Sequence, residues 1–75
     1  MRKRFKQLLA ENLVVNLKDG STLSGVLWSD RGGLLVLRNA QYHDNEADVS
    51  VDGEAIILIE NIAFLQRPEV TRASN

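Results

Sequence analysis

The residues that could do chemistry in this chain are few and scattered. The 75 residues contain no cysteine and one histidine, His43, in a polar stretch beside Asp44. Cysteine-based and histidine-rich metal sites are therefore excluded. Asp30 and its neighbours Ser29 and Arg31 stand in a predicted turn, and no Ser/His/Asp or paired-carboxylate arrangement follows from the spacing. We expect a solvated histidine, no catalytic site and no cofactor.

The acidic stretch at Asp48 has the spacing that begins a calcium-binding loop. Asp48, Ser50 and Asp52 alternate with other residues, and Gly53 follows them. Such a loop also needs a bidentate glutamate at its twelfth position, which here is Ile59. We therefore expect no bound metal, and we assign the glycine to a hairpin turn.

Basic residues gather at the start of a chain whose formal net charge is −1. A cluster of this kind can bind nucleic-acid phosphates, and a ring of subunits would multiply its weak contacts. The alternative is a solvated chain end that aids solubility, and the residues favour neither reading. The four candidates are Arg2, Lys3, Arg4 and Lys6.

Two aromatic side chains, Trp28 and Tyr42, could stack on bases. Trp28 alternates with Leu27 and therefore points to the opposite face of its predicted strand. Because aromatic side chains are enriched in interfaces, we favour packing of Trp28 under the N-terminal segment or between subunits.

Hydrophobic periodicity predicts one mostly β domain, residues 1–75, with a core over 3–67 and a loose tail over 68–75. Phe5, Leu8 and Leu9 predict a helix over 3–11. Period-two patterns predict strands, and the segment 40–53 is predicted to be a loop or an extended hairpin end. Gly25 inside a strand predicts the sharp bend of a small antiparallel barrel. The five predicted strands are 12–18, 21–29, 34–38, 54–59 and 62–67.

The run from Ala55 to Ile59 is apolar at every position and does not alternate as a half-solvated strand should. A domain this small buries little surface by itself, and the chain has no disulfide to support it. We therefore predict that this run pairs with another copy of the chain. The alternative is that the helix or the 40–53 segment covers it. The predicted interface residues are Ala55, Ile57, Ile59, Ile62, Phe64 and Leu65.

Over residues 3–67 the pattern resembles the Sm and Sm-like family, which includes the bacterial host-factor proteins. The second family motif is matched over Ile57–Leu65. The resemblance implies an N-terminal helix capping a strongly bent five-stranded, SH3-type barrel. It also implies rings of five to seven subunits, in which the fourth strand pairs with the fifth strand of the neighbour, and binding of single-stranded RNA. The first motif is matched by Val15, Leu17, Gly20, Gly25, Leu27, Asp30, Leu37, Asn39 and Ala40.

The base-binding residues of the family are replaced. The base-contacting asparagine falls on Leu34, and the bacterial Lys-His pair falls on Ile59 and Glu60. The Arg-Gly pair of other members falls on Leu58 and Ile59. Glu60 adds negative charge where RNA phosphates approach, which opposes binding. The resemblance thus implies a non-standard pocket, with the four basic residues and Asp30, Arg31, Gly33, Leu34 and Asn61 as RNA-binding candidates.

Two other functions stay open: a structural or protein-adaptor ring without nucleic acid, and a monomeric SH3-like barrel that binds a protein. No apolar run approaches the roughly 20 residues that span a bilayer, and the basic start is not followed by the apolar region of a signal peptide. We expect a cytoplasmic protein without a membrane partner. Its small size and divergence suit a phage or mobile-element origin.

Overall fold

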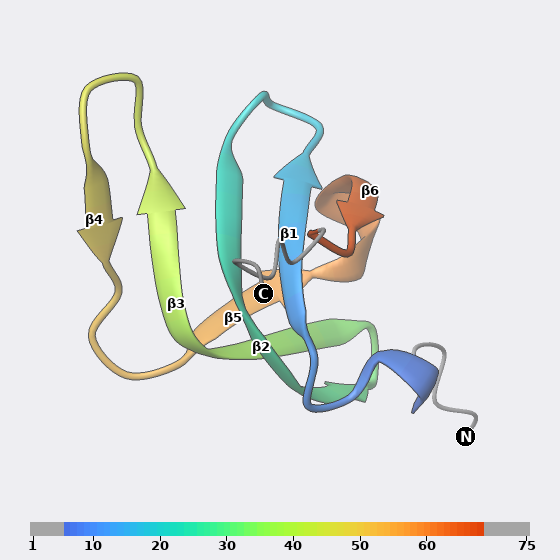
Figure 1. Ribbon diagram of the computed structural model, residues 1–75. Coiled ribbons are helices and arrows are strands. Elements are labelled where there is room, and N and C mark those ends of the chain that lie inside the picture. Colours follow the sequence, from blue (N-terminus) through green and yellow to red (C-terminus); the bar gives the residue numbers. More distant parts are fainter. Residues whose placement is uncertain (1–5, 69–75) are drawn as a thin grey trace.

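The fold, seen in a computed structural model, is a strongly bent antiparallel sheet, which confirms the mostly β prediction (Figure 1). The structure describes residues 6–68. The strands pair in the order β4-β3-β2-β1-β6, and β5 pairs with the other half of β3. Within residues 6–68, no helix has the length and apolar character needed to cross a membrane. The strands are β1 (Asn12–Leu17), β2 (Thr22–Arg31), β3 (Leu34–His43), β4 (Asp48–Ser50), β5 (Ala55–Leu58) and β6 (Ile62–Gln66).

The predicted helix over 3–11 is wrong for the residues that are described. Only one turn of 3₁₀ helix forms, over Lys6–Leu8, and residues 1–5 lie outside the described part. The Ala10 N–H, which would close the next helical turn, instead donates to the Leu27 carbonyl at 2.8 Å. The Leu27 N–H donates to the Glu11 carbonyl at 2.9 Å. Hydrogen bonds to β2 therefore outcompete a helical propensity, which is only a weak preference.

The bend predicted at Gly25 is present in β2. The register with β3 shifts between Ser24 and Val26, opposite Asn39, which has a left-handed φ of 53°. A Cβ atom on Gly25 would lie 3.0 Å from the Arg38 carbonyl oxygen. The two backbones approach so closely that only glycine fits without a shift. This bulge turns both strands sharply and lets the sheet curl around its core.

The segment 40–53 forms the extended hairpin end that was one of its two predicted forms. The second half of β3 continues to His43 and pairs with β4, for example Tyr42 opposite Val49. Because β4 and β5 both pair with β3, they form one strand interrupted at residues 51–54, where Gly53 has a φ of 82°. In Figure 1 the β3–β4 hairpin projects away from the rest of the sheet.

The core is a single small cluster inside the bent sheet. Its residues come from β1, β2, β3 and β5, and Val15, Leu27 and Leu35 have no exposed surface. Half-buried apolar side chains from β6 and from the turns close the cluster. The buried apolar residues are Leu13, Val15, Leu27, Leu35, Leu37, Ala40, Ala55 and Ile57.

Candidate functional site

Two consecutive strands, β5 and β6, are edges of the sheet. Among the described residues, β5 pairs only with β3, and β6 pairs only with β1. The turn over Ile59–Asn61 separates them, so they do not close on each other. Each strand therefore presents one row of backbone N–H and C=O groups that no neighbouring strand covers. Such rows are templates for pairing with another chain.

The side chains of β5 alternate between the core and the surface. Ala55 and Ile57 are buried in the chain's own core, whereas Ile56 is 63% exposed and Leu58 is 47% exposed. The exposed apolar side chains of β5 are thus Ile56 and Leu58, which were absent from the predicted interface set. An uninterrupted apolar run carries no signal of period two, so the sequence could not show which residues face outward.

The apolar surface continues on β6. Phe64 is 56% exposed, and Ile62 and Leu65 are half-buried against the core. Four of the predicted interface residues, namely these three and Ile59, line a shallow cavity of about 370 Å³ together with Ala63. The two edge strands therefore carry exposed apolar side chains, and an apolar depression lies along β6 and the turn that precedes it.

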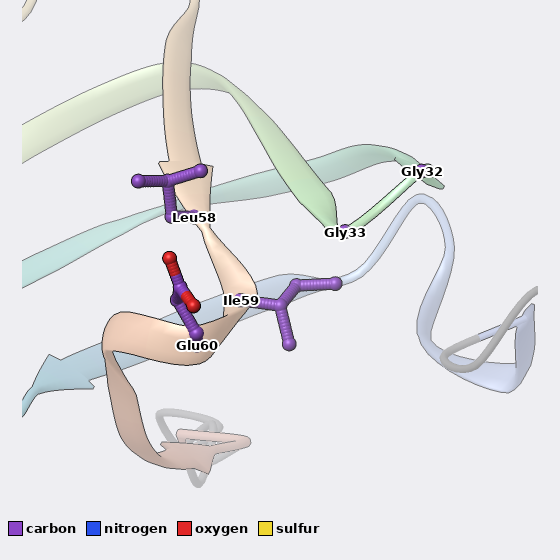
Figure 2. Close-up of a pocket in the computed structure, with 5 residues that line it drawn as sticks. All are labelled: Gly32, Gly33, Leu58, Ile59 and Glu60. Atoms are coloured by element: carbon purple, nitrogen blue, oxygen red, sulfur yellow. The ribbon is translucent and has the colours of Figure 1, made fainter.

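A second cavity, of about 360 Å³, lies between two turns that are far apart in the sequence (Figure 2). Gly32 and Gly33 of the β2–β3 turn form one wall, and Leu58, Ile59 and Glu60 form the other. The Ile59 N–H donates to the Gly33 carbonyl at 2.9 Å, which holds the two walls together. Hereafter these five residues are called the glycine-turn pocket.

The glycine-turn pocket is apolar apart from one carboxylate. Gly32 and Gly33 have φ values of 62° and 79°, and no atom lies within 4 Å of a Cβ placed on either one. Their backbone is therefore open to a ligand at close range. Among the described residues, Glu60 is the only ionisable one in the lining, so this part of the chain supplies no cation there to hold a phosphate.

The predicted RNA-binding residues do not gather at one place. Gly33 lines the glycine-turn pocket, while Asp30 and Arg31 line another cavity of about 400 Å³ with Leu9, Trp28 and Ser29. Asn61 is exposed, and its carbonyl accepts a hydrogen bond from the Lys18 N–H at 2.8 Å. Leu34 is paired with Leu58, and Lys6 is exposed. Arg2, Lys3 and Arg4 lie outside the described residues.

Trp28 lies on the outer face of β2, opposite the buried Leu27, and is 50% exposed. The Arg38 guanidinium lies 3.9 Å from the centre of the indole ring, and its Nε donates to Glu54 at 2.8 Å. The ion pair holds the guanidinium over the ring, so one face of this aromatic side chain is already occupied within the subunit.

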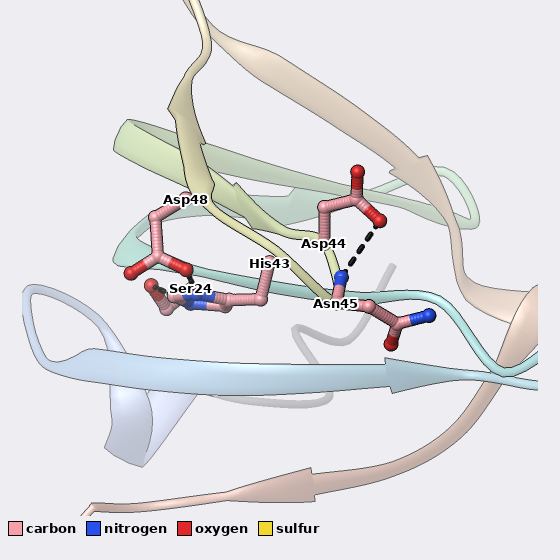
Figure 3. A network of polar contacts seen from close by, with 5 residues as sticks. All are labelled: Ser24, His43, Asp44, Asn45 and Asp48. Atoms are coloured by element: carbon pink, nitrogen blue, oxygen red, sulfur yellow. Dashed lines mark hydrogen bonds and ion pairs between the residues drawn. The ribbon is translucent and has the colours of Figure 1, made fainter.

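The structure corrects the prediction of a solvated His43. The Nδ1 atom of His43 lies 2.9 Å from an Asp48 carboxylate oxygen, and its Nε2 atom lies 2.8 Å from Ser24 Oγ (Figure 3). A histidine held between a serine and an aspartate is also the arrangement of the catalytic triad in serine hydrolases. The spacing of these residues in the sequence did not reveal it. Ser24 lies in the middle of β2, where it is paired with Val14 on β1 and Gln41 on β3. None of the three network residues, Ser24, His43 and Asp48, lines the cavities described above. We interpret the network as a structural contact that holds the β3–β4 hairpin against β2.

The fold is that of Sm-like proteins. A heptameric archaeal Sm protein superposes with a TM-score of 0.77 at 20% identity, covering 85% of this chain and 94% of that one. The SmAP1 heptamer of P. aerophilum gives 0.78 at 20% identity, covering 87% and 88%. A Sm-like archaeal protein from Pyrobaculum aerophilum gives 0.73 at 24%, covering 87% of this chain and 48% of that one. The sequence matches no family model and no curated protein.

Proposed function

We propose that this chain assembles into a homo-oligomeric ring, in which β5 of one subunit pairs with β6 of the next. The observation that carries the proposal is the pair of edges left unpaired among the described residues, with exposed Ile56 and Phe64. Because the two edges are different surfaces, each subunit would use β5 against one neighbour and β6 against the other. A head-to-tail contact of this kind forms a ring when the rotation between successive subunits closes. Two of the structures that share the fold are heptamers.

Subunit pairing would also supply stability that the small core lacks. Only eight apolar residues are buried within the described part of the subunit. Adding a strand at each edge satisfies backbone groups and removes apolar side chains from water at about 25 cal/mol per Å². The ring is therefore the natural state for this sheet, with five to seven subunits as the expected range.

Native mass spectrometry and sedimentation test the assembly directly. The expected species is a single multiple of the 8.4 kDa subunit mass at micromolar concentration. Dilution should dissociate it, because assembly depends on subunit concentration. A clean monomer at micromolar concentration would contradict the ring.

We further propose that the ring binds single-stranded RNA, through the glycine-turn pocket and the N-terminal basic residues. The support is the position of the pocket, which lies between the same two turns that carry the family's base-contacting positions by resemblance. The competing function is a structural or adaptor ring without nucleic acid. The Glu60 carboxylate favours this competitor, because it repels phosphates in a pocket without a cation.

Oligo-U and oligo-A binding at low salt separates these two functions. We expect salt-sensitive binding that falls when Arg2, Lys3, Arg4 and Lys6 are changed together to Ala. Each lost phosphate contact should flatten the dependence of log K on log salt by about 0.7 on single strands. If the parent protein shows no salt-sensitive binding to either RNA, the adaptor function is the correct one.

A further inference from the structure

We infer that the glycine-turn pocket selects guanine bases in single-stranded RNA, with Glu60 as the specificity-determining residue. The inference rests on the proposed RNA-binding function. It goes beyond that function by naming the base and the side chain that reads it. Three features of the pocket carry it: its shape, the hydrogen-bonding capacity of Glu60, and its charge.

The shape of the pocket suits a planar base. Gly32 and Gly33 present bare backbone with open space beside it, and Leu58 and Ile59 contribute aliphatic side chains. A planar base can lie against such walls without a clash, since both glycines lack the Cβ that would fill this space. The volume of about 360 Å³ is within the range of small-ligand sites, about 300–1,000 Å³. The pocket can thus hold a purine together with the water at its edge.

Glu60 determines which base edge the pocket binds. Figure 2 shows its carboxylate rising from the turn toward Leu58, and Glu60 is one of the residues that line the pocket. An ionised carboxylate only accepts hydrogen bonds, and its two oxygens match two adjacent donors. Guanine offers two such donors on its Watson–Crick edge, N1–H and the N2 amino group. The pair is therefore bidentate and charge-assisted.

The other bases fit the carboxylate less well. Uracil places a single N3–H between two carbonyl oxygens, and these oxygens face the carboxylate as acceptor against acceptor. Cytosine and adenine each offer one amino group beside a ring nitrogen that accepts. The expected order of preference is guanine first, cytosine and adenine next, and uracil last. One good bidentate pair discriminates by about tenfold or more.

The negative charge of the pocket favours entry of a base edge over entry of the RNA phosphate backbone. Within residues 6–68, the pocket lining contains one carboxylate and no cation, so these residues repel a phosphate but not a neutral base. Contacts of this kind release no counterions. The preference for guanine should therefore persist as salt is raised, whereas the contribution of the basic N-terminal residues should fall.

The test compares RNAs that differ by one functional group. Fluorescence anisotropy at low salt is measured for a uracil tract, for the same tract with single guanines between uracils, and for that RNA with inosine at each guanine. Inosine keeps N1–H but lacks the N2 amino group. We expect guanine to bind about tenfold more tightly than uracil, and inosine to lose most of that gain.

The protein variants assign the preference to one carboxylate. Glu60→Gln should bring the guanine and uracil affinities within about twofold, because the amide replaces one acceptor with a donor. Glu46→Gln is the matched control, since it makes the same charge change at an exposed position in the turn between β3 and β4. It should keep the full preference. Native mass spectrometry should show the parent assembly for both variants.

Three outcomes overturn the inference and differ in what they say of RNA binding. If all RNAs bind equally in the parent and in Glu60→Gln, the base selection is wrong, while RNA binding by the ring stands. If no RNA binds, the proposed RNA function fails with it. An arginine-rich peptide can also be tested. If it binds, if Glu60→Gln abolishes its binding and if RNA does not compete with it, the pocket binds a guanidinium group, and the ring is a protein adaptor.

Discussion

Strands β3 and β5 lie side by side with nearly the same composition, yet they have different roles. The first half of β3 reads Leu34-Leu35-Val36-Leu37, and β5 reads Ala55-Ile56-Ile57-Leu58. Their side chains pair one to one, with Leu35 opposite Ile57. The difference is in the neighbours: among residues 6–68, the first half of β3 is flanked by β2 and β5, whereas β5 is flanked by β3 alone.

This difference teaches that an apolar strand becomes a core strand or an interface strand through its position in the sheet. The inner faces of both strands are buried in the subunit. The outer residue Val36 is half-buried, while Ile56 opposite it is 63% exposed. One more strand beside β5 would make the two environments alike. The following predictions separate the contribution of the inner face of β5 to subunit stability from the contribution of its exposed edge to assembly.

The largest expected effect is on the inner face of β5. Ile57→Asp places a charge where the side chain is 7% exposed, next to buried Leu35. The lost burial and the desolvated carboxylate should together lower the free energy of unfolding by about 4 kcal/mol or more. Urea unfolding followed by circular dichroism measures the loss. Ile57→Val is the control, with an expected loss of about 1 kcal/mol. A folded, intact assembly of Ile57→Asp would place this residue outside the core.

The bend in the central strands is the next target. Gly25→Ala puts a methyl group 3.0 Å from the Arg38 carbonyl oxygen and 3.1 Å from the Ala40 Cα. Both neighbours are backbone and cannot turn aside, so the loss should be about 1–3 kcal/mol. The same urea titration measures it. An unchanged midpoint would mean that β2 and β3 can separate here without loss.

The outer face of β5 should show the opposite pattern. Ile56→Asp adds a charge to an exposed position, so the subunit keeps its strand content while the dissociation midpoint rises about tenfold or more in concentration. Val49→Asp makes the same kind of change at another exposed apolar residue, on β4, and should leave assembly unchanged. Sedimentation at several concentrations measures both. Equal dissociation of the two variants would move the interface away from β5.

The smallest effect belongs to the turn of the first hairpin. The Ser21 N–H donates to Asp19 Oδ1 at 2.8 Å, and this hydrogen bond lowers the pKa of Asp19 below its ordinary 3.8. A lowered pKa in the folded state contributes stability that is present above pH 3.8 and is lost as pH falls through the lowered value. Asp19 is fully exposed, so the contribution is small.

Asp19→Asn removes this pH dependence. The parent should be slightly more stable than the variant at neutral pH, and the difference should vanish as the pH falls below 3.8. Thermal unfolding of both proteins between neutral pH and pH 3 measures it. A difference that grows as the pH falls would have the wrong sign for this hydrogen bond.

Much of the fold was predictable where local signals agree. Alternation marked the buried Leu13 and Val15, Asp19-Gly20 marked the first turn, and Gly25 marked the bend. The N-terminal helix failed because its pattern was a local preference, and a non-local pair of hydrogen bonds with Leu27 outweighed it. Local signals are reliable only where the tertiary structure offers the backbone no better partner.

The candidate sites were predictable only in part, because they join segments that are remote in the sequence. The interface set included Phe64 but missed Ile56 and Leu58, since an uninterrupted apolar run has no period. The glycine-turn pocket joins residues 32–33 to 58–60, and the His43 network reaches back to Ser24 on the neighbouring strand β2. No spacing rule along one segment predicts such contacts.

The sequence by itself determined the class of this protein: a small, bent, antiparallel β domain without cysteine and with an excess of apolar residues in its last third. These properties follow from residue type and periodicity, which act locally. The tertiary structure decided which face of β5 is exposed, which backbone edges stay unpaired, and which carboxylate stands in the glycine-turn pocket. Those properties depend on strand register and on bulges, where a shift of one residue reverses every side chain.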